Sequence, residues 1–536
     1  MNSTELTGYA QVFSRALIGL EAPEVRVEVD ISNGLPACHL VGLPEAEVRE
    51  SRDRVRSAIQ HAGFDFPNRR ITINLAPADL PKNSGRFDLP IALGILVASG
   101  QIQEPGLQAK LTSHEFVGEL SLSGQIKPIL GGLALALAHR KLPEDGKRIL
   151  VMPHEHQAEL TAINHLGFGA NISKEGYPQS MPLLTAAKLD EVAHFLGGLG
   201  SLSNIPHGPF SLPSFRQSAL DFGDVKGQAG AKRALEIAAA GQHSAMLIGS
   251  PGVGKSMLAQ RLPGILPKSD PQELLTQAAM LSLRGLLEAN RLALSLGEPA
   301  FRAPHHSASV AAIVGGGNPP RPGEISLAHG GVLFLDELAE FNRSVLEALR
   351  EPLEAHKVLI SRSTRHSEFP ARFQLIAAMN PCPCGYLGHS SGRCRCSPER
   401  IQNYQARISG PLLDRIDLHI TVPSISEGEL LSKNDAETES SQTIFERVSL
   451  ARVRQLARQG RANALLSAAE VNEVCELSTE VSQFTQMALA RLSWSGRSIH
   501  RVLKVARTIA DLAGVNDIGR EHIAEAIQWR RAIAMK

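Results

Sequence analysis

The sequence lacks the features that mark secreted, membrane-spanning or disulfide-rich proteins. Its N-terminus has no basic segment followed by an apolar core, so no signal peptide is evident. The most apolar stretch, around residues 91–98, is too short to cross a bilayer. Six cysteines in 536 residues do not indicate a disulfide scaffold. We therefore expect a cytoplasmic protein with no membrane partner.

Net charge is also nearly absent. The 55 Lys and Arg residues balance 54 Asp and Glu residues, leaving a formal net charge of +1. This balance excludes a globally basic surface for nucleic acid, so any polyanion site has to be a local patch. With 43% hydrophobic and 20% charged residues the composition is that of a globular protein. The length predicts about three or four domains.

Four segments follow from the residue patterns. Residues 1–195 mix strand and helix patterns, and a Gly/Ser/Pro-rich linker is predicted at 196–216. Residues 217–424 carry the nucleotide motifs described next. Residues 425–536 begin with a polar loop and continue as helices.

Individual elements are predicted from hydrophobic periodicity. Residues 25–29 and 71–75 alternate apolar and polar side chains, which is typical of half-buried strands. Residues 45–62 and 88–99 have helical patterns. One amphipathic face runs through 499–510.

The segment 249–256 fits the phosphate-binding loop pattern at every fixed position. It follows an apolar run that indicates a buried strand, and a helix pattern follows it. The glycines let backbone N–H groups close around phosphate oxygens, and the helix N-terminus adds favourable partial charge. We expect Lys255 to reach the outer phosphates and Ser256 to hold Mg²⁺. The predicted nucleotide-binding residues are Gly249, Ser250, Pro251, Gly252, Val253, Gly254, Lys255 and Ser256.

A second apolar run, 332–335, ends in two acidic residues. A carboxylate at the end of a buried strand suits a metal shell, and we assign Asp336 to Mg²⁺ with Ser256. Glu337 suits activation of an attacking water. The two motifs together predict an enzyme that binds and hydrolyses ATP.

Three further positions extend this site. Asn380 ends another apolar strand and has an amide that can orient the lytic water. Arg415 lies among apolar anchors, and Arg501 lies in the C-terminal helical block, with Arg497 as the alternative. In their linear order they resemble sensor 1, the arginine finger and sensor 2 of the AAA+ superfamily. The resemblance implies a ring, commonly a homo-hexamer, in which the finger enters a neighbouring subunit's site. Either arginine alone is equally consistent with a surface salt bridge.

Two inserted segments resemble the magnesium-chelatase branch of AAA+. The first, 302–331, contains His305 and His306, which are either ligands or, more simply, solvated loop residues. The second, 357–366, resembles the hairpin before sensor 1, which points into the pore in that branch. Arg362 and Arg365 near its tip are predicted to hold DNA phosphates, the alternative being a solvated turn.

Four cysteines cluster directly after Asn380. Cys382, Cys384, Cys394 and Cys396 form two C-x-C pairs separated by nine residues. Four thiolates suit tetrahedral zinc, although the spacing departs from the usual C-x2-C. A structural zinc ion is the leading interpretation, and a redox pair or a metal-free loop are the alternatives.

The N-terminal block resembles Lon-type protease domains at 80–100 and 118–133. The resemblance implies an α+β domain of the ribosomal S5 domain 2 type. The catalytic serine position of that family falls on Arg86 and its lysine position on Ala134, while Ser84 is out of register. Because both chemical groups are missing, we expect no proteolysis.

This order of parts resembles the ComM (YifB) family over nearly the whole chain. Its most specific segments are 302–309, 380–385 and 408–419. The resemblance implies an α/β protein with an inactive Lon-like domain, an AAA+ core with a parallel sheet and a helical lid. It also implies a hexameric DNA helicase that drives branch migration of single-stranded and branched DNA during natural transformation, together with recombination proteins. A metal-insertion motor of the magnesium-chelatase type and a protein-remodelling ATPase are the alternatives.

Overall fold

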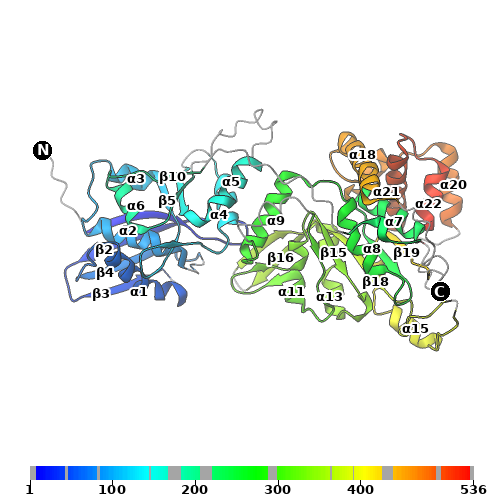
Figure 1. Cartoon of the computed structure of the whole chain (residues 1–536), viewed down its shortest axis with the longest axis horizontal. Coiled ribbons are helices and arrows are strands. Elements are labelled where there is room, and N and C mark those ends of the chain that lie inside the picture. Colours follow the sequence, from blue (N-terminus) through cyan, green and yellow to red (C-terminus); the bar gives the residue numbers. More distant parts are fainter. Residues whose placement is uncertain are drawn as a thin grey trace.

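The computed structural model shows three parts along one long axis (Figure 1). The N-terminal part lies at one end, the helical C-terminal part at the other, and the part with the nucleotide motifs between them. The structure describes residues 8–42, 46–80, 82, 85–143, 147–166, 183–205, 220–287, 299–362, 365–389, 391–424, 439–490 and 496–530. None of the helices within these ranges combines the length and the apolar character that a membrane span requires.

An eight-stranded mixed sheet and its helices form the N-terminal part. The elements are β1 (Tyr9–Arg15), β2 (Glu24–Ser32), β3 (Ala37–Val41), α1 (Ala46–His61), β4 (Arg70–Ala76), α2 (Asp88–Ala98), α3 (Leu107–Ser113), β5 (His114–Phe116), β6 (Glu119–Leu120), β7 (Ile126–Lys127), α4 (Gly132–Arg140), β8 (Ile149–Pro153), α5 (Gln157–Leu166), β9 (Leu183–Ala186), α6 (Leu189–Leu196) and β10 (Ser203–Asn204). The sheet order is β10-β9-β8-β5-β1-β2-β4-β3. The predicted strands β2 and β4 pair antiparallel and bury their alternate residues, and buried helix α2 packs against β1 and β2. The expected α+β class is confirmed.

A five-stranded parallel sheet forms the centre of the molecule. The elements are α7 (Ala229–Gly241), β11 (Ala245–Ile248), α8 (Lys255–Arg261), α9 (Pro271–Leu283), β12 (Phe301–Arg302), α11 (Val310–Val314), β13 (Gly315–Gly316), β14 (Arg321–Pro322), α12 (Glu324–Leu327), β15 (Val332–Leu335), α13 (Arg343–Ala348), α14 (Pro352–Ala355), β16 (Lys357–Arg362), β17 (Arg365–Pro370), β18 (Gln374–Met379), α15 (Pro398–Gln405), α16 (Gly410–Leu413) and β19 (Leu418–Thr421). The order β12-β15-β18-β11-β19 places both nucleotide motifs at the carboxyl edge, because every pairing is parallel.

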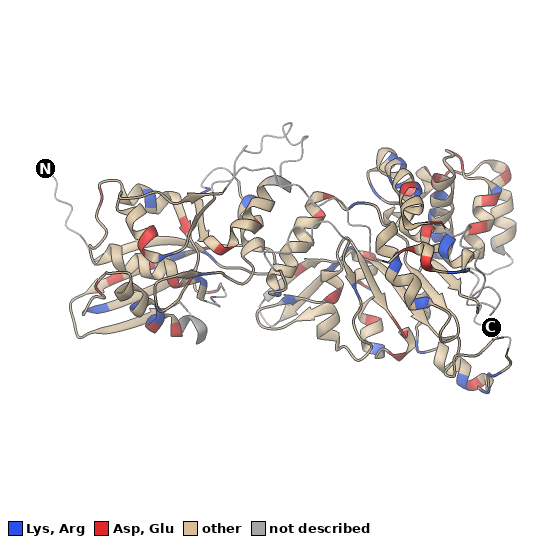
Figure 2. Cartoon of the chain, in the orientation of Figure 1, with Lys and Arg blue, Asp and Glu red and all other residues tan. Residues whose placement is uncertain are grey.

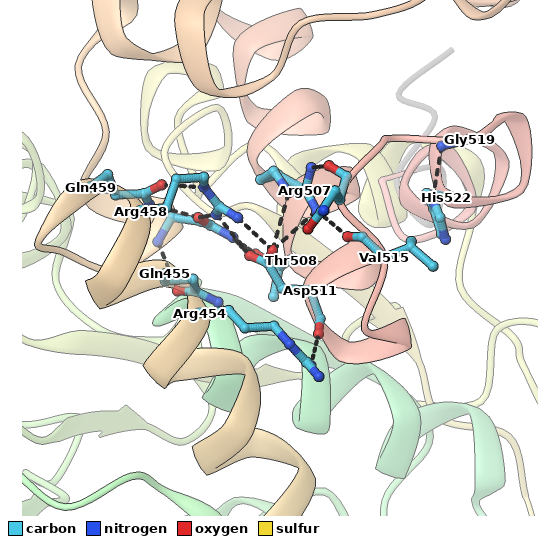
Figure 3. Close-up of polar contacts among 12 residues, drawn as sticks. Arg454, Gln455, Arg458, Gln459, Arg507, Thr508, Asp511, Val515, Gly519 and His522 are labelled. Atoms are coloured by element: carbon cyan, nitrogen blue, oxygen red, sulfur yellow. Dashed lines mark hydrogen bonds and ion pairs between the residues drawn. The ribbon is translucent and has the colours of Figure 1, made fainter.

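The C-terminal part is helical, as predicted. It contains α18 (Ser441–Gln459), α19 (Ala468–Val474), α20 (Thr479–Ala490), α21 (Gly496–Ala513) and α22 (Arg520–Gln528). A buried polar cluster ties α18 to α21: the carboxylate of Asp511 accepts hydrogen bonds from Arg458 at 2.7 and 3.0 Å (Figure 3). Thr508 of α21 also bonds Nε2 of His243 at 2.8 Å. Since His243 precedes β11, this contact fixes the lid on the amino edge of the central sheet.

The N-terminal and central parts share a hydrophobic core. Helix α9 belongs to the central part by sequence, yet Leu274, Leu275, Ala278 and Ala279 are buried in one cluster with Leu133 of α4. Asp270 caps α9 by accepting from the backbone N–H of Gln272 at 2.8 Å. The two parts therefore contact each other through packed side chains as well as through the linker.

The linker begins later than the residue pattern predicts. The pattern puts its start at residue 196, but Ser203 and Asn204 form β10, which pairs antiparallel with β9. Ile205 is also buried in the N-terminal core. The Gly and Ser residues before β10 are compatible with a short edge strand, because backbone pairing needs no particular side chain. The rest of the predicted linker, 206–216, lies outside the described residues.

Acidic and basic residues are interspersed in all three parts (Figure 2). This distribution agrees with the formal net charge of +1. Long-range attraction of a polyanion to the whole molecule is therefore weak, and a local site has to supply affinity.

Candidate functional site

A cavity of about 350 Å³ opens at the carboxyl edge of the central sheet. Its lining includes Lys255, Ser256, Asp336, Glu337 and Asn380. The structure thus brings together five residues that belong to three separate motifs of the sequence. The register explains this, because β15 and β18 are neighbours and Leu335 lies opposite Ala377.

The phosphate loop follows directly from the buried strand β11. Gly252 and Gly254 have φ angles of +80° and +94°, which L-residues with side chains rarely adopt. At Gly249 a Cβ atom would lie 2.5 Å from the carbonyl oxygen of Val422. Helix α8 begins at Lys255, so its N-terminal N–H groups face the cavity.

Lys255 is held by acceptors on both sides of the loop. Its Nζ donates to the carbonyl oxygens of Gly249 at 2.7 Å and Ser250 at 3.0 Å. It also donates to Oδ1 of Asn380 at 3.0 Å. Burial lowers the pKa of the Lys255 ammonium, partly offset by Asp336 and Glu337. Asn380 therefore shares its amide oxygen with the loop lysine.

Ser256 and Asp336 form the oxygen pair expected of a Mg²⁺ site. The Ser256 hydroxyl donates to Oδ2 of Asp336 at 2.6 Å. The other carboxylate oxygen of Asp336 accepts the backbone N–H of Glu337 at 2.9 Å. A hydroxyl and a carboxylate at this spacing match the hard oxygen ligands that Mg²⁺ prefers.

Glu337 has an unusual backbone and an unpredicted neighbour. Its φ angle of +52° lies in the left-handed region, which is uncommon for a glutamate. The side chain is 56% exposed, and its Oε2 lies 3.4 Å from Nδ1 of His306. The sequence favours a simply solvated His306, but β12 pairs with β15 and carries the following loop to Glu337. No sequence spacing indicates this contact.

Arg415 and Arg501 do not line the cavity. Arg501 pairs with Asp417 and donates to the carbonyl oxygen of Arg415 at 3.0 Å. Asp417 directly precedes β19, at the amino edge of the sheet, whereas the phosphate loop follows the carboxyl end of β11. Four strand residues separate these edges by about 13 Å. The two arginines thus lie together at the amino edge of the sheet, whereas Lys255 lies at its carboxyl edge.

The side chain of Arg415 is largely buried. It forms an ion pair with Glu354 at 2.7 Å and its own exposed fraction is 9%. Nη1 donates to the carbonyl oxygen of Pro411 at 2.7 Å. Both partners come from short elements of the central part, so α14 and α16 fix this guanidinium.

Both predicted insertions form hairpins. Strands β16 and β17 pair antiparallel, with Arg362 opposite Arg365, and β13 pairs with β14. The two hairpins lie against each other, because a Cβ atom at Gly315 would be 2.7 Å from Cδ1 of Ile360. The Arg362 and Arg365 side chains lie outside the described residues, so their DNA contacts stay a prediction.

The four cysteines converge. Their sulfur atoms all lie within 4.8 Å of one another. The Cys382 sulfur lies 3.4 Å from that of Cys384 and 3.8 Å from that of Cys394, and Cys384 and Cys394 are 3.7 Å apart. A tetrahedron with Zn–S bonds of about 2.3 Å has sulfurs about 3.8 Å apart, so the residues fit zinc. The backbone N–H of Tyr386 lowers the pKa of Cys384 to about 6, whereas the neighbouring thiols raise the pKa of Cys394 and Cys396, so Cys384 ionises before these two.

The positions expected for protease chemistry are close but inert. The buried Arg86 donates to the carbonyl oxygen of Leu130 at 3.2 Å, just before the helix that carries Ala134. Burial lowers the pKa of Arg86 to about 10. The guanidinium of Arg86 thus stands at the position of the nucleophile, and the methyl group of Ala134 stands at the position of its base. Ser84 lies outside the described residues.

Comparison with known proteins agrees with this geometry. The family profile "Magnesium chelatase, subunit ChlI" matches residues 221–430, its C-terminal profile matches 438–530, and "Subunit ChlI of Mg-chelatase" matches 27–156. "Competence protein ComM" of Haemophilus influenzae is 44% identical over 98% of each chain. The chain belongs to the ComM/YifB family of magnesium-chelatase-like AAA+ proteins. "Uncharacterized protein YifB" of Escherichia coli is 45% identical over 97% of this chain and 96% of that protein.

A more distant similarity reaches Lon protease 2 of Bacillus subtilis. It is 28% identical over 189 residues, which is 30% of this chain and 33% of that protein. Membership of the ComM/YifB family implies ATP and Mg²⁺ as ligands of the cavity and ATP hydrolysis as its reaction.

Proposed function

We propose that this protein is an ATP-driven hexameric DNA motor, a branch-migration helicase that promotes integration of transforming single-stranded DNA by homologous recombination. The main support for a multi-subunit motor is that Arg415 and Arg501 lie away from the phosphate loop of their own chain. Full-length similarity at 44% identity to a protein named for competence supports the biological setting.

The residues of the cavity divide the chemistry among them. Lys255 exchanges its carbonyl acceptors for the outer phosphates of ATP, and the loop N–H groups bind the remaining phosphate oxygens. Glu337 accepts a proton from the attacking water, which Asn380 orients. Ser256 and Asp336 would hold Mg²⁺, which would neutralise charge at the phosphates.

A neighbouring chain completes the site. Arg415 and Arg501 stabilise the charge that develops on the phosphoryl group bound by the next subunit. Because the arginine comes from a neighbouring subunit, ATP hydrolysis depends on how the two subunits are positioned in the ring. Their placement at the amino edge, beside each other and opposite the phosphate loop, supports this division.

DNA contacts fall to the β16–β17 hairpin. Arg362 and Arg365 stand at its tip and hold backbone phosphates, which carry no sequence information. The two packed hairpins move together with the nucleotide state. Since charges are mixed elsewhere, this local pair has to supply much of the electrostatic attraction.

The decisive experiment measures ATP hydrolysis with no DNA, with single-stranded DNA and with a branched junction, each at several salt concentrations. We expect stimulation by DNA that fades as salt rises, because phosphate contacts release counterions. Arg362→Ala combined with Arg365→Ala should keep basal hydrolysis and lose branch migration. Absence of DNA binding at low salt with ATP present would remove the proposal.

The cysteine cluster has a structural role in this proposal. Zinc held by the four thiolates fixes the backbone that follows Asn380. Metal analysis of protein purified without chelators should give about one zinc per chain. Less than about 0.2 zinc per chain would exclude zinc at this cluster.

A second candidate function rests on the three magnesium-chelatase profiles. A metal-insertion motor would hydrolyse ATP in response to a porphyrin and its partner subunits rather than DNA. Adding porphyrin and Mg²⁺ to the same hydrolysis assay separates the two. An unfolded protein substrate in a further arm tests for a remodelling ATPase.

A further inference from the structure

The loop that carries the cysteines touches the phosphate loop at one tight point. Gly385 has a φ angle of +81°, and a Cβ atom there would lie 2.5 Å from Cδ of Pro251 and 2.7 Å from Cγ. Because a real Cβ atom is essentially never found at such distances, only a glycine lets the backbone at residue 385 lie this close to the Pro251 ring. Pro251 is part of the segment that we assign to the phosphates of ATP.

Gly385 closes a turn that contains two of the thiols. Its backbone N–H donates to the carbonyl oxygen of Cys382 at 2.9 Å, so Cys382, Pro383, Cys384 and Gly385 form one β-turn. Two sulfurs of the cluster and the contact with Pro251 therefore belong to a single four-residue unit. A metal that fixes the sulfurs also fixes the glycine.

A second contact joins the same segment to the nucleotide site. Asn380, which precedes this turn, accepts the hydrogen bond from Lys255. In contrast, among the residues that the structure describes, no neighbouring atom lies within 4 Å of the position that a Cβ atom would take at Gly252 or Gly254. The cysteine segment thus supports the phosphate loop at Pro251, in addition to the contact of Gly249 with Val422.

We propose that metal occupancy of the cysteine cluster and nucleotide occupancy of the phosphate loop are coupled through the contact of Gly385 with Pro251. This inference rests on the proposed ATP and zinc sites. Zinc would order the turn, and the turn would hold Pro251 in place. The phosphate loop would then lose less conformational entropy when it binds phosphates. Coupling of two binding equilibria is reciprocal, so bound nucleotide also retains zinc.

The test follows zinc loss from the full chain with a zinc-selective chelator and a colorimetric zinc indicator. It is run with and without a non-hydrolysable ATP analogue and excess Mg²⁺. At equilibrium with the chelator, we expect the analogue to lower the apparent dissociation constant of zinc by about fivefold or more. A fluorescent nucleotide should bind the zinc-depleted chain more weakly by a similar factor, because the coupling is mutual.

Two glycines of the same loop provide a matched pair of variants. Gly385→Ala and Gly388→Ala both place alanine in the left-handed region, at φ angles of +81° and +76°. Only the first meets Pro251, since no atom of the described residues lies within 4 Å of a Cβ atom at Gly388. We expect Gly385→Ala to keep its zinc but lose the nucleotide effect on zinc release, and Gly388→Ala to keep both.

Pro251→Ala tests the contact from its other side if Gly385→Ala does not fold. It removes the ring atoms and leaves the cysteine loop unchanged, and it should also uncouple the two sites. Equal zinc release with and without nucleotide in the unchanged chain would overturn the coupling while leaving both sites intact. A chain that contains no zinc would instead overturn the zinc assignment, and one that binds no nucleotide would overturn the ATPase assignment.

Discussion

Glu337 is the carboxylate that we propose as the base for the attacking water. Its backbone is left-handed, and its N–H donates to Asp336. Its side chain is 56% exposed and lines the cavity, and His306 is its neighbour. A residue held in this rare conformation is typical of functional sites.

Replacing Glu337 separates binding from hydrolysis. Glu337→Gln keeps the shape and should bind ATP normally, while steady-state hydrolysis falls about 10²–10⁴-fold because the water loses its base. Glu340→Gln is the control, since Glu340 pairs with Arg407 in solvent at 3.0 Å. Normal turnover by Glu337→Gln would show that another group accepts the proton.

Asp417 is the residue on which the lid contact depends most. It is 5% exposed and interacts with Arg501 and with Nδ1 of His243 at 3.1 Å. Burial alone would raise the pKa of its carboxyl, but Arg501 and His243 outweigh burial and hold that pKa well below its ordinary range. The charged form is therefore the one that stabilises the fold.

Asp417→Asn should destabilise the protein by about 3–5 kcal/mol, because it leaves a guanidinium with no charged partner. Denaturant unfolding measures this loss. The control Asp414→Asn removes a carboxylate that is 51% exposed, and should cost at most about 1 kcal/mol.

The effect of Asp417 has a defined pH dependence. A depressed pKa gives stability that is complete above the unfolded value near 3.9 and declines as pH falls below it. The difference between Asp417→Asn and the unchanged chain should thus be constant near neutrality and shrink below about pH 4. A difference that grows on acidification would contradict the assignment.

Helix α9 is the element that joins two domains. Four apolar residues of this helix lie in the core cluster of the N-terminal part, where Ala278 is 2% exposed. The sequence of α9 is apolar enough for either core, so its pattern does not reveal which one it enters. Helix α9 thus packs into the core of the N-terminal domain while belonging to the central domain by sequence.

Ala278→Asp should release the N-terminal domain from α9, since a carboxylate placed in an apolar contact has no partner. Limited proteolysis should then proceed faster, while the central part alone keeps its fold. The control Gln272→Asp places the same charge on an exposed position in the first turn of the helix. Unchanged proteolysis of Ala278→Asp would mean that the linker or the contact of Gly19 with Ser367, and not α9, holds the domains together.

If Arg415 and Arg501 act on the ATP bound by a neighbouring subunit, the ATP site is complete only in the assembled ring. Lys255→Ala and Arg415→Ala chains should each be inactive. When they are mixed in equal amounts, about a quarter of the sites should combine an intact loop with an intact finger and hydrolyse ATP.

The matched control for this mixing experiment is Lys255→Ala with Glu337→Gln. Both changes affect the same side of the site, so no combination restores a complete one. No activity in the first mixture would place Arg415 in the site of its own chain, and activity in this control would show that the mixing assay does not report sites shared between chains.

The amino-acid sequence by itself determined the local chemistry and the class of fold. Phosphate loop, acidic strand end and cysteine pairs are each formed by residues close in the chain, and periodicity identified β2, β4, α1 and α2 correctly. A family resemblance supplied the order of the domains. These features depend on backbone propensity and side-chain type, which can be predicted from each short segment separately.

Only the tertiary structure decided which distant segments meet. His306 reaches Glu337 because β12 pairs with β15, and Arg501 faces Asp417 at the edge of the sheet away from the phosphate loop. The start of the linker was misplaced because β10 is recognised only by its pairing with β9. Gly385 against Pro251 is likewise a long-range contact. Such contacts arise from packing across the fold, and the order of residues along the chain does not encode them locally.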